Sequence, residues 1–392
     1  MQIKHYIYSS IILLAFVLSS CNSNSKDDKS DDARAINSEG KTVSSFDISI
    51  KYAQGFSVEK FDNYHRVIVH NPWQKGNDIG VYILAQKNEV GSIELQENEV
   101  LIELPLEHIA IMSASNVGYF SLLEKIHQIN AVADKSRLYN KNLRYGIELG
   151  NVKVLGNSEI INVEELLLAN SDIFLQTAYE ASSGKDQALI DGGILVVYNI
   201  DWMEKTPLAR AEWIKFVGLL CNENQKADSI FKLIENNYIQ LKYLADTLDY
   251  KPDVLIGGLY KDVWYMPGGK SFKAYLLADA GTNYHWITDS TEGSLALSFE
   301  TVMEQQLNAA VWIEVPFESK EELLISDERY AYFDAFKIGS IYHHSKRSND
   351  SGGNDYWEMG LCRPDEILAD LIRIFHPEVM EDGELKYYDR VK

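Results

Sequence analysis

Hydrophobic and polar positions alternate between about residues 46 and 103. Apolar runs centred on 46–50, 67–69, 81–84 and 100–102 are separated by polar, Gly-containing stretches. Alternation with a period of two is typical of strands that bury one face. The pattern therefore predicts a block of antiparallel strands.

After Pro105 the pattern changes to short apolar runs that alternate with helical periodicity. Apolar runs at 109–112, 131–133, 173–175 and 194–197 are interspersed with predicted helices near 117–127 and 162–169. Such alternation is typical of a parallel sheet covered by helices on both faces. Thr206 followed by Pro207 then marks the start of a helix to about Leu220, because Thr is a favourable N-cap and Pro fits the first helical position.

The longest helical signal runs from residue 224 to 248. Apolar side chains recur there at steps of three and four, and neither Pro nor Gly interrupts the pattern before Pro252. At 1.5 Å per residue, roughly 25 residues reach about 37 Å, which is long enough to connect two domains.

The alternation resumes beyond this helix, with strands predicted at 254–256 and 311–313 and helices at 271–280, 299–307 and 365–375. We therefore predict an α/β fold with two Rossmann-like lobes joined by a single long helix, preceded by an extra N-terminal β-strand block. The predicted segments are an N-terminal lobe with added strands at 46–223, a connecting helix at 224–248 and a C-terminal lobe at 249–392.

The first residues are predicted to lie outside the fold. Lys4 precedes an apolar run at 11–18, which is too short to span a hydrocarbon core of about 30 Å but suits a secretory signal peptide over residues 1–20. Leu18-Ser-Ser-Cys21 resembles the bacterial lipobox, which implies cleavage before Cys21 and a lipid on its thiol.

Residues 21–45 are mostly polar and predict a flexible tether. Within it, Lys26-Asp-Asp28 resembles the acidic tags that send some Bacteroidetes lipoproteins to the cell surface, although a solvated linker would have the same composition. We expect a protein anchored by lipid in the cell envelope, facing the periplasm or exposed at the surface.

Composition narrows the choice of partners. The 392 residues carry 37 basic and 58 acidic side chains, a net charge of −21, which becomes −22 if residues 1–20 are removed with Lys4. A nucleic acid or an anionic membrane surface would repel such a chain, so nucleic acid is excluded as a partner. Three cysteines fit neither a disulfide scaffold nor a zinc motif. Cys221 and Cys362 either pair in an oxidising compartment or remain buried thiols.

One short pattern recurs in both halves of the chain. Asn162-Val-Glu164 and Ser298-Phe-Glu300 each place a capping residue two positions before a glutamate, ahead of a short helix and an apolar strand. An acidic side chain in the first helical turn stabilises the helix dipole by about 0.3–1 kcal/mol, which explains either glutamate taken alone.

The two halves resemble the lobes of the helical-backbone periplasmic binding proteins, which carry vitamin B12, iron siderophores and haem to ABC importers. The resemblance rests on the order and spacing, around the long helix, of the two glutamate motifs and of the segments 114–116, 132–134, 171–173 and 278–283. It implies that Glu164 and Glu300 dock onto arginines of the transporter, so an ABC permease and its ATPase are the expected partners. The block at 46–103 departs from the small B12-binding members, and we interpret it as an elaboration of the first lobe that bears on ligand choice.

Candidate ligand-binding residues lie in the loops after the predicted strands, where ligands of open parallel sheets bind. They are Lys135, Arg137, Tyr139 and Tyr179 in the first lobe, Trp264, Tyr265 and Trp286 in the second, and Trp357 before the last helix. Aromatic rings offer a flat or chelated ligand a large contact area, and the two basic residues offer charge to a carboxylate or ferric chelate. Strand packing for Trp264 and Tyr265, and simple solvation for the two basic residues, are the ordinary alternatives.

We therefore expect a monomeric substrate-binding protein that captures an iron-siderophore, haem or cobalamin-like ligand between two lobes. No cofactor is expected, and a metal only as part of a bound chelate. The chain carries no nucleophile elbow, phosphate loop, zinc-protease helix or dinucleotide fingerprint. Two alternatives stay open: a chelatase-like or corrinoid-processing enzyme on the same scaffold, and a surface adhesin or glycan-binding lipoprotein.

Overall fold

The computed structural model describes residues 35–36, 42–43, 48–74, 76–157, 160–178, 184–380 and 382–392. The chain divides into two compact units, Met1–Phe46 and Asp47–Lys392. In the first unit, β1 (Ala35–Ile36) and β2 (Thr42–Val43) pair antiparallel. The predicted signal peptide, the lipobox with Cys21 and most of the tether lie outside the described residues. Among the helices of the described segments, none has the length and apolar character needed to cross a membrane.

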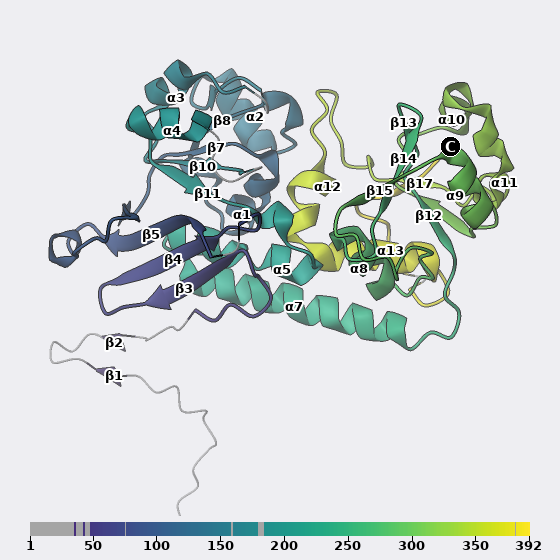
Figure 1. The fold of residues 1–392 in the computed structure, drawn as a ribbon, viewed down its shortest axis with the longest axis horizontal. Helices are drawn as coiled ribbons and strands as arrows, with labels where there is room; N and C mark the ends of the chain where they lie inside the picture. The colour runs from purple at the N-terminus through teal and green to yellow at the C-terminus, as the bar shows by residue number, and fades with distance from the viewer. Residues whose placement is uncertain are drawn as a thin grey trace, which may run out of the picture. The chain divides into compact units, whose positions relative to one another are not determined.

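The first lobe of the second unit is built on a five-stranded parallel sheet in the order β11-β10-β7-β8-β9 (Figure 1). Its strands are β7 (Ile109–Ile111), β8 (Ile129–Val132), β9 (Lys153–Val154), β10 (Ile173–Gln176) and β11 (Val196–Tyr198). The helices that follow these strands are α1 (Val117–Leu122), α2 (Lys141–Glu148), α3 (Val163–Ala169) and α4 (Gly184–Asp191). All three residues of β7 are buried, as expected for a central strand of a parallel sheet. The α/β prediction is confirmed.

The added block is a four-stranded sheet in the order β3-β4-β5-β6. Its strands are β3 (Phe56–Lys60), β4 (Tyr64–His70), β5 (Asp78–Gln86) and β6 (Glu99–Leu104). The first three are antiparallel, but β6 pairs parallel to β5, so the prediction of a wholly antiparallel block is wrong. Alternation of apolar and polar residues is the same in both arrangements, so the pattern could not distinguish them.

The strand predicted over residues 46–50 is also wrong, because residues 48–50 form no strand. The backbone that follows is held by side chains instead of a ladder. Buried Glu212 accepts the backbone N–H groups of Lys51, Tyr52 and Ala53 at 2.6–2.9 Å. A segment whose N–H groups are used in this way has no donors left for pairing with a strand.

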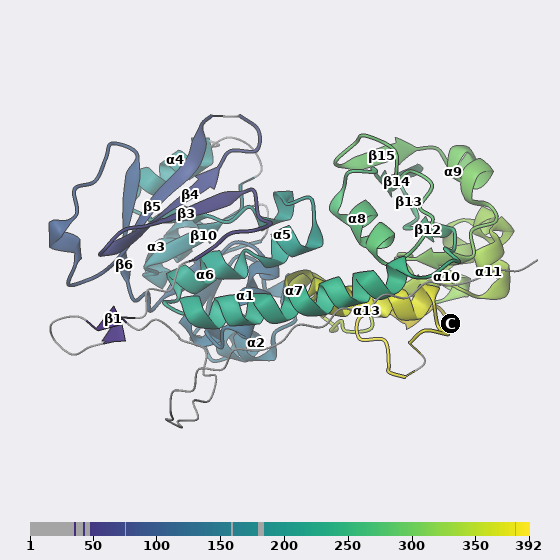
Figure 2. The same ribbon diagram turned by 90° about the horizontal axis from the view of Figure 1, so that it is seen from below.

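Two short helices and one long helix follow the first lobe: α5 (Pro207–Ala211), α6 (Ile214–Leu220) and α7 (Asn224–Asp246). Thr206 caps α5 as predicted, with its hydroxyl accepting the N–H of Ala209 at 3.3 Å. Helix α7 packs against α5 and α6 and also against α8 (Phe272–Asp279) and α13 (Pro364–Phe375). Figures 1 and 2 show it extending from the first lobe to the second.

The second lobe has a parallel strand pair and two antiparallel sheets, one of three strands and one of two. The parallel strands are β12 (Val254–Ile256) and β16 (Val311–Ile313), and the antiparallel ones are β13 (Leu259–Tyr260), β14 (Val263–Pro267) and β15 (Ser294–Leu297), with β17 (Tyr342–His343) paired to β18 (Asp389–Arg390). The other helices are α9 (Phe299–Gln306), α10 (Lys320–Ser326), α11 (Asp334–Ile338) and α12 (Asp355–Glu358).

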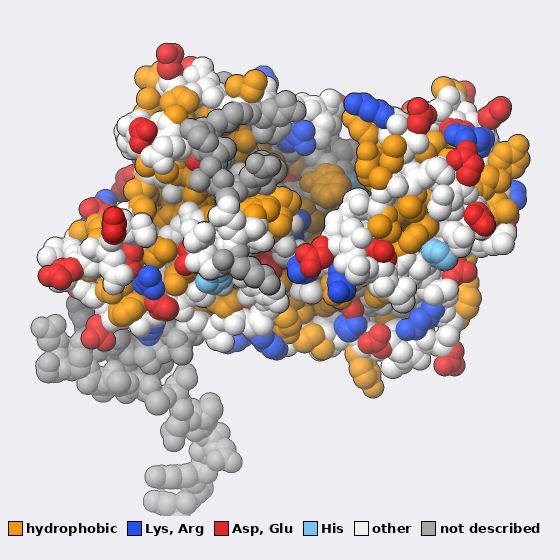
Figure 3. All heavy atoms as spheres, in the orientation of Figure 1, with side chains coloured by type: hydrophobic (Ala, Val, Ile, Leu, Met, Phe, Trp, Pro, Cys, Tyr) orange, Lys and Arg blue, Asp and Glu red, His pale blue; other side chains and the backbone are white. Residues whose placement is uncertain are grey.

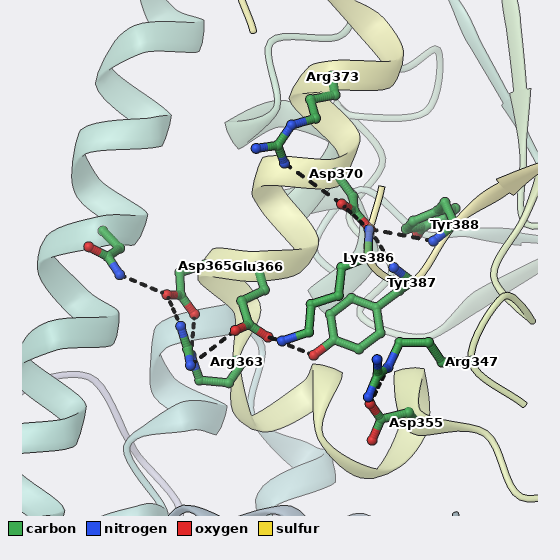
Figure 4. A network of polar contacts seen from close by, with 11 residues as sticks. Arg347, Asp355, Arg363, Asp365, Glu366, Asp370, Arg373, Lys386, Tyr387 and Tyr388 are labelled. Carbon is green, nitrogen blue, oxygen red and sulfur yellow. Dashed lines mark hydrogen bonds and ion pairs between the residues drawn. The ribbon is translucent and has the colours of Figure 1, made fainter. Parts of the chain in front are cut away.

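A polar network fixes α13 between α7 and the C-terminal segment (Figure 4). Asp365 accepts a hydrogen bond from the Asn237 side chain of α7 at 3.1 Å. Asp370, which is fully buried, accepts the backbone N–H groups of Lys386 and Tyr387 at 2.8 and 2.7 Å. The buried carboxylate is thus satisfied by backbone donors, which ties the end of the chain to the helix.

Helix α12 connects the lobes. The Glu358 Oε2 atom accepts the backbone N–H groups of Tyr139 and Asn140 in the first lobe, at 2.8 and 3.2 Å. At Gly118 of α1, an added Cβ would lie 2.3 Å from the carbonyl O of Glu358, so this contact requires glycine. Burial raises the pKa of Glu358 to about 7, although both N–H donors favour the charged form.

This carboxyl predicts a specific pH dependence of stability. Its pKa is higher in the folded chain than its ordinary 4.5, so the folded state binds the proton more tightly, and the free energy of unfolding falls as pH rises from about 5 to 7. At about 1.4 kcal/mol per pKa unit, wild type should lose roughly 2–3 kcal/mol between pH 5 and 8 relative to Glu358→Gln, whose amide does not titrate. Denaturant unfolding of both proteins at several pH values measures the difference.

The matched control is Glu304→Gln on α9, which alters an exposed glutamate outside this contact. It should keep the pH slope of wild type. An unchanged slope in Glu358→Gln as well would contradict the raised pKa.

Candidate functional site: the cleft between the lobes

A hollow lies between the two lobes on the face shown in Figure 3, and hydrophobic side chains line its floor at the position of α12. The exposed hydrophobic side chain of α12 is Trp357, which is 48% exposed, whereas Tyr356 beside it is fully buried. Helix α12 contacts the turn after β7 at the carboxyl edge of the first sheet. The Tyr356 hydroxyl donates a hydrogen bond to Glu314, which directly follows β16 in the parallel strand pair of the second lobe. Both sheets therefore point their carboxyl ends at this cleft.

A buried polar cluster supports the second-lobe side of the cleft. The Glu314 carboxylate accepts hydrogen bonds from Tyr388 at 2.7 Å and Tyr356 at 3.0 Å, and forms an ion pair with Lys273. Lys273 Nζ also donates to the Tyr356 hydroxyl at 2.5 Å. The His344 ring packs on Tyr356 and on Trp357, with centroids 4.6 and 5.2 Å apart. The cluster thus fixes the position of the exposed indole.

The protonation states in this cluster follow from the ion pair. Burial alone would raise the pKa of Glu314, but the charge of Lys273 and the hydrogen bonds from Lys273 and Tyr388 help to outweigh it and lower the pKa to about 2. Burial opposes the charge of Lys273 too, yet Glu314 and Tyr356 raise its pKa. Desolvation lowers the pKa of His344, so this ring is neutral near pH 7. The cluster carries no net charge.

On the first-lobe side, Lys135 and Arg137 lie in the turn after β8 and both are exposed. The Arg137 Nε atom is 3.6 Å from the Asp134 carboxylate, so part of its charge is balanced locally. Tyr139 is half-buried, and the Arg347 guanidinium lies 5.5 Å from its ring centroid. The Glu358 contact places the Tyr139 backbone close to α12, and the two basic side chains are exposed in their turn.

The four remaining predicted residues have different surroundings. Trp264 is fully buried against Phe299 and Trp312, with centroids 6.1 and 5.9 Å apart, so it forms the lobe core and cannot line the cleft as predicted. Tyr265 alternates with it on β14 and is exposed. Trp286 is half-buried in the loop between α8 and β15. Tyr179 lies outside the described residues.

Sequence reasoning missed Lys273, Glu314, Tyr356 and Tyr388. Glu314 directly follows the strand predicted at 311–313, so the strand-end rule applied to the other candidates would have found it. The others have no comparable signal, because three distant segments bring them together. Cys221 and Cys362 are both buried and free. Within the described segments, no group of three or more His, Cys, Asp or Glu side chains is arranged to hold a metal ion.

Glu164 and Glu300 lie at matching positions. Asn162 caps α3 by accepting the N–H of Glu164 at 2.9 Å, and Ser298 caps α9 by accepting the N–H of Thr301 at 3.1 Å. Both glutamates therefore occupy the first helical turn and both are exposed, one in each lobe.

Comparison with known proteins gives the family. The family model described as periplasmic binding protein matches residues 109–347. An uncharacterized lipoprotein of Methanocaldococcus jannaschii is 25% identical over 312 residues, which cover 75% of this chain and 71% of the relative.

Two solved structures are similar in fold. A periplasmic heme binding protein from Pseudomonas aeruginosa has a TM-score of 0.55 at 15% identity, covering 74% of this chain and 99% of that one. A molybdate periplasmic binding protein of a Haemophilus influenzae ABC transporter has a TM-score of 0.56 at 17% identity, covering 72% and 90%. As the sequence resemblance implied, this chain belongs to the periplasmic binding protein family.

Proposed function

We propose that this protein binds a metal chelate or metal macrocycle, of the iron-siderophore, haem or cobalamin kind, in the cleft above α12 and delivers it to an ABC permease. The observation that carries the proposal is Trp357, an indole held half-exposed where the carboxyl ends of both sheets converge. A fixed aromatic face gives a large, flat ligand a wide contact at little loss of rotamer entropy. The similar proteins described as binding heme and molybdate support a ligand that contains a metal.

The charged pairs of the cleft favour binding over catalysis, and Glu358, whose pKa is about 7, is buried in its contact with the first lobe. A general acid or base needs a pKa near the working pH. The ion pair instead lowers the pKa of Glu314 and raises that of Lys273, so both side chains stay charged at neutral pH. Arg347 is likewise paired with Asp355, Nε to Oδ2 at 2.6 Å. These charges hold α12 in place and have no proton to exchange with a ligand.

Docking to the permease is assigned to the faces that carry Glu164 and Glu300. Around Glu164, the helix α3 also exposes Val163, Leu167 and Leu168, the last to 69%. An exposed apolar patch with a carboxylate in it is typical of a protein interaction surface. We assign attachment of the chain to the membrane to a lipid on Cys21, in line with the lipoprotein relative.

Ligand titrations test the first part of this proposal. Haemin, cobalamin and a ferric siderophore, added singly to the purified protein, should reveal at least one ligand that quenches tryptophan fluorescence saturably and is recovered unmodified. Trp357→Ala should lower the affinity for that ligand about tenfold or more, because it removes the exposed ring at the floor of the cleft. Tyr243→Ala, on the exposed side of α7, is the matched control and should bind like wild type.

Two results would contradict this part. Release of a chemically altered ligand would favour the enzyme alternative, and saturable binding to glycans but to none of the chelates would favour the adhesin alternative. Equal ligand affinities of wild type and Trp357→Ala would show that the Trp357 indole does not contact the ligand.

Docking is predicted to be asymmetric between the lobes. Glu300 already pairs with Arg329, Nη1 to Oε1 at 3.2 Å, while Glu164 has no ion-pair partner among the described residues. A permease cation must displace Arg329 from Glu300 before it can pair with this carboxylate. Loss of the existing exposed pair, which contributes about 0–1 kcal/mol, offsets part of the free energy gained from the new pair. Glu164→Gln should therefore weaken binding to the permease in nanodiscs about tenfold, and Glu300→Gln by a smaller factor.

Glu148→Gln and Glu304→Gln neutralise other exposed glutamates of the two lobes and should leave this affinity unchanged. Unaltered binding of the double charge-reversal variant Glu164→Lys with Glu300→Lys at low salt would refute docking through these two residues.

A further inference from the structure

The added sheet reaches the rim of the cleft through one tryptophan. Trp73 lies in the connection between β4 and β5, with its ring centroid 6.4 Å from that of Trp202. Asn71 Oδ1 accepts the backbone N–H groups of Trp73 and Gln74, both at 2.9 Å, and this turn presents the indole. Both tryptophan rings are partly exposed.

Trp202 marks the carboxyl edge of the first-lobe sheet. It lies in the helical turn that begins at Asp201, shortly after β11. Its Nε1 donates to the carbonyl O of Ala178, just beyond β10, at 3.2 Å. Three residues later, Lys205 Nζ pairs with Glu292 Oε1 of the second lobe at 2.6 Å. The pair of tryptophans is therefore next to a contact between the lobes, at the edge where ligands of open sheets bind.

Backbone contacts set the position of Trp73. Buried Glu204 accepts the N–H of Gly55 at 2.8 Å and the Nε1–H of Trp213 at 2.9 Å. The carbonyl O of Gly55 in turn accepts the N–H of His70, the last residue of β4, at 2.9 Å. The end of β4 is thereby held close to Trp202, so the two rings meet in a defined arrangement.

We propose that Trp73 and Trp202 form an aromatic shelf on the first-lobe rim, which holds a planar conjugated ring of the ligand. This inference rests on the proposed function and narrows the ligand to ring-bearing chelates, namely catecholate complexes, porphyrins or corrins. The charge of neighbouring Lys205 is balanced by Glu292, so the shelf selects for ring surface instead of ligand charge. The added sheet then supplies a ligand contact that the two lobes alone lack.

The test compares probes with and without a conjugated ring. Ferric tris-catecholate, haemin, cobalamin and an aliphatic ferric trihydroxamate are titrated against wild type, Trp73→Ala, Trp73→Phe and Phe61→Ala, with thermal unfolding of each. Phe61 is the matched control, because it is an exposed aromatic residue of the same sheet at the opposite end of β4. For the ring-bearing probe that wild type binds, Trp73→Ala should lower the affinity about tenfold and Trp73→Phe at most about threefold. Phe61→Ala should leave this affinity unchanged.

The outcomes separate the two proposals. Equal affinity of wild type and Trp73→Ala for a ring-bearing probe that still depends on Trp357 would overturn the shelf and leave the proposed function intact. Tight binding of the trihydroxamate alone, or an equal loss in Trp73→Ala for probes with and without a ring, would likewise overturn the shelf. If wild type binds none of the probes saturably, the proposed function fails and the shelf fails with it.

Discussion

The carboxylate of Glu358 joins the two lobes. Glu358 lies on α12, which belongs to the second lobe, and its carboxylate accepts two backbone N–H groups of the first lobe. Three consecutive side chains of α12 have different surroundings. Tyr356 is buried against Glu314, Glu358 is buried against the first lobe, and Trp357 between them is left exposed. The same geometry that fixes the lobes relative to each other thus fixes the indole at the floor of the cleft.

Other contacts reinforce this connection, so the lobes have little freedom to open. Asn349 Nδ2 donates to the carbonyl O of Leu138 at 2.9 Å, and Arg144 Nη2 to the Ser351 hydroxyl at 3.1 Å. Helix α7 packs on both lobes over its length. For the binding that we propose, a cleft held by so many contacts needs only small adjustments, and a preorganised site loses less conformational entropy on binding than a wide hinge would.

How much of this could be read from the sequence depends on the range of the interactions involved. Thr206, Asn162 and Ser298 cap helices through bonds to residues two or three positions away, so the sequence pattern alone locates those helix starts. Trp264 shows the opposite case. Its position after a predicted strand indicated a ligand contact. Its burial, however, depends on Phe299 and Trp312, which come from other parts of the chain.

The cleft cluster could not be predicted for the same reason. Lys273, Glu314 and Tyr356 are adjacent only after α8, β16 and α12 have packed together. The parallel pairing of β6 with β5 also depends on the path of the connection and not on the pattern of either strand. The family could be predicted more closely than these details, since the two glutamate motifs that suggested it are local and recur once in each lobe.

The charge of the whole chain and the charge of its cleft obey different constraints. The protein carries −21 overall, yet several basic groups around the cleft are balanced at short range: Lys273 by Glu314, Arg347 by Asp355 and Lys205 by Glu292. Paired charges hold backbone elements in place but add little net potential for an anionic ligand. What the cleft presents to a solute is therefore mainly aromatic surface, with Trp357 on its floor and partly exposed Tyr139 beside it. Recognition by contact area suits a large ligand with flat ring surface, and a small free anion would find few unpaired donors among the described residues of this site.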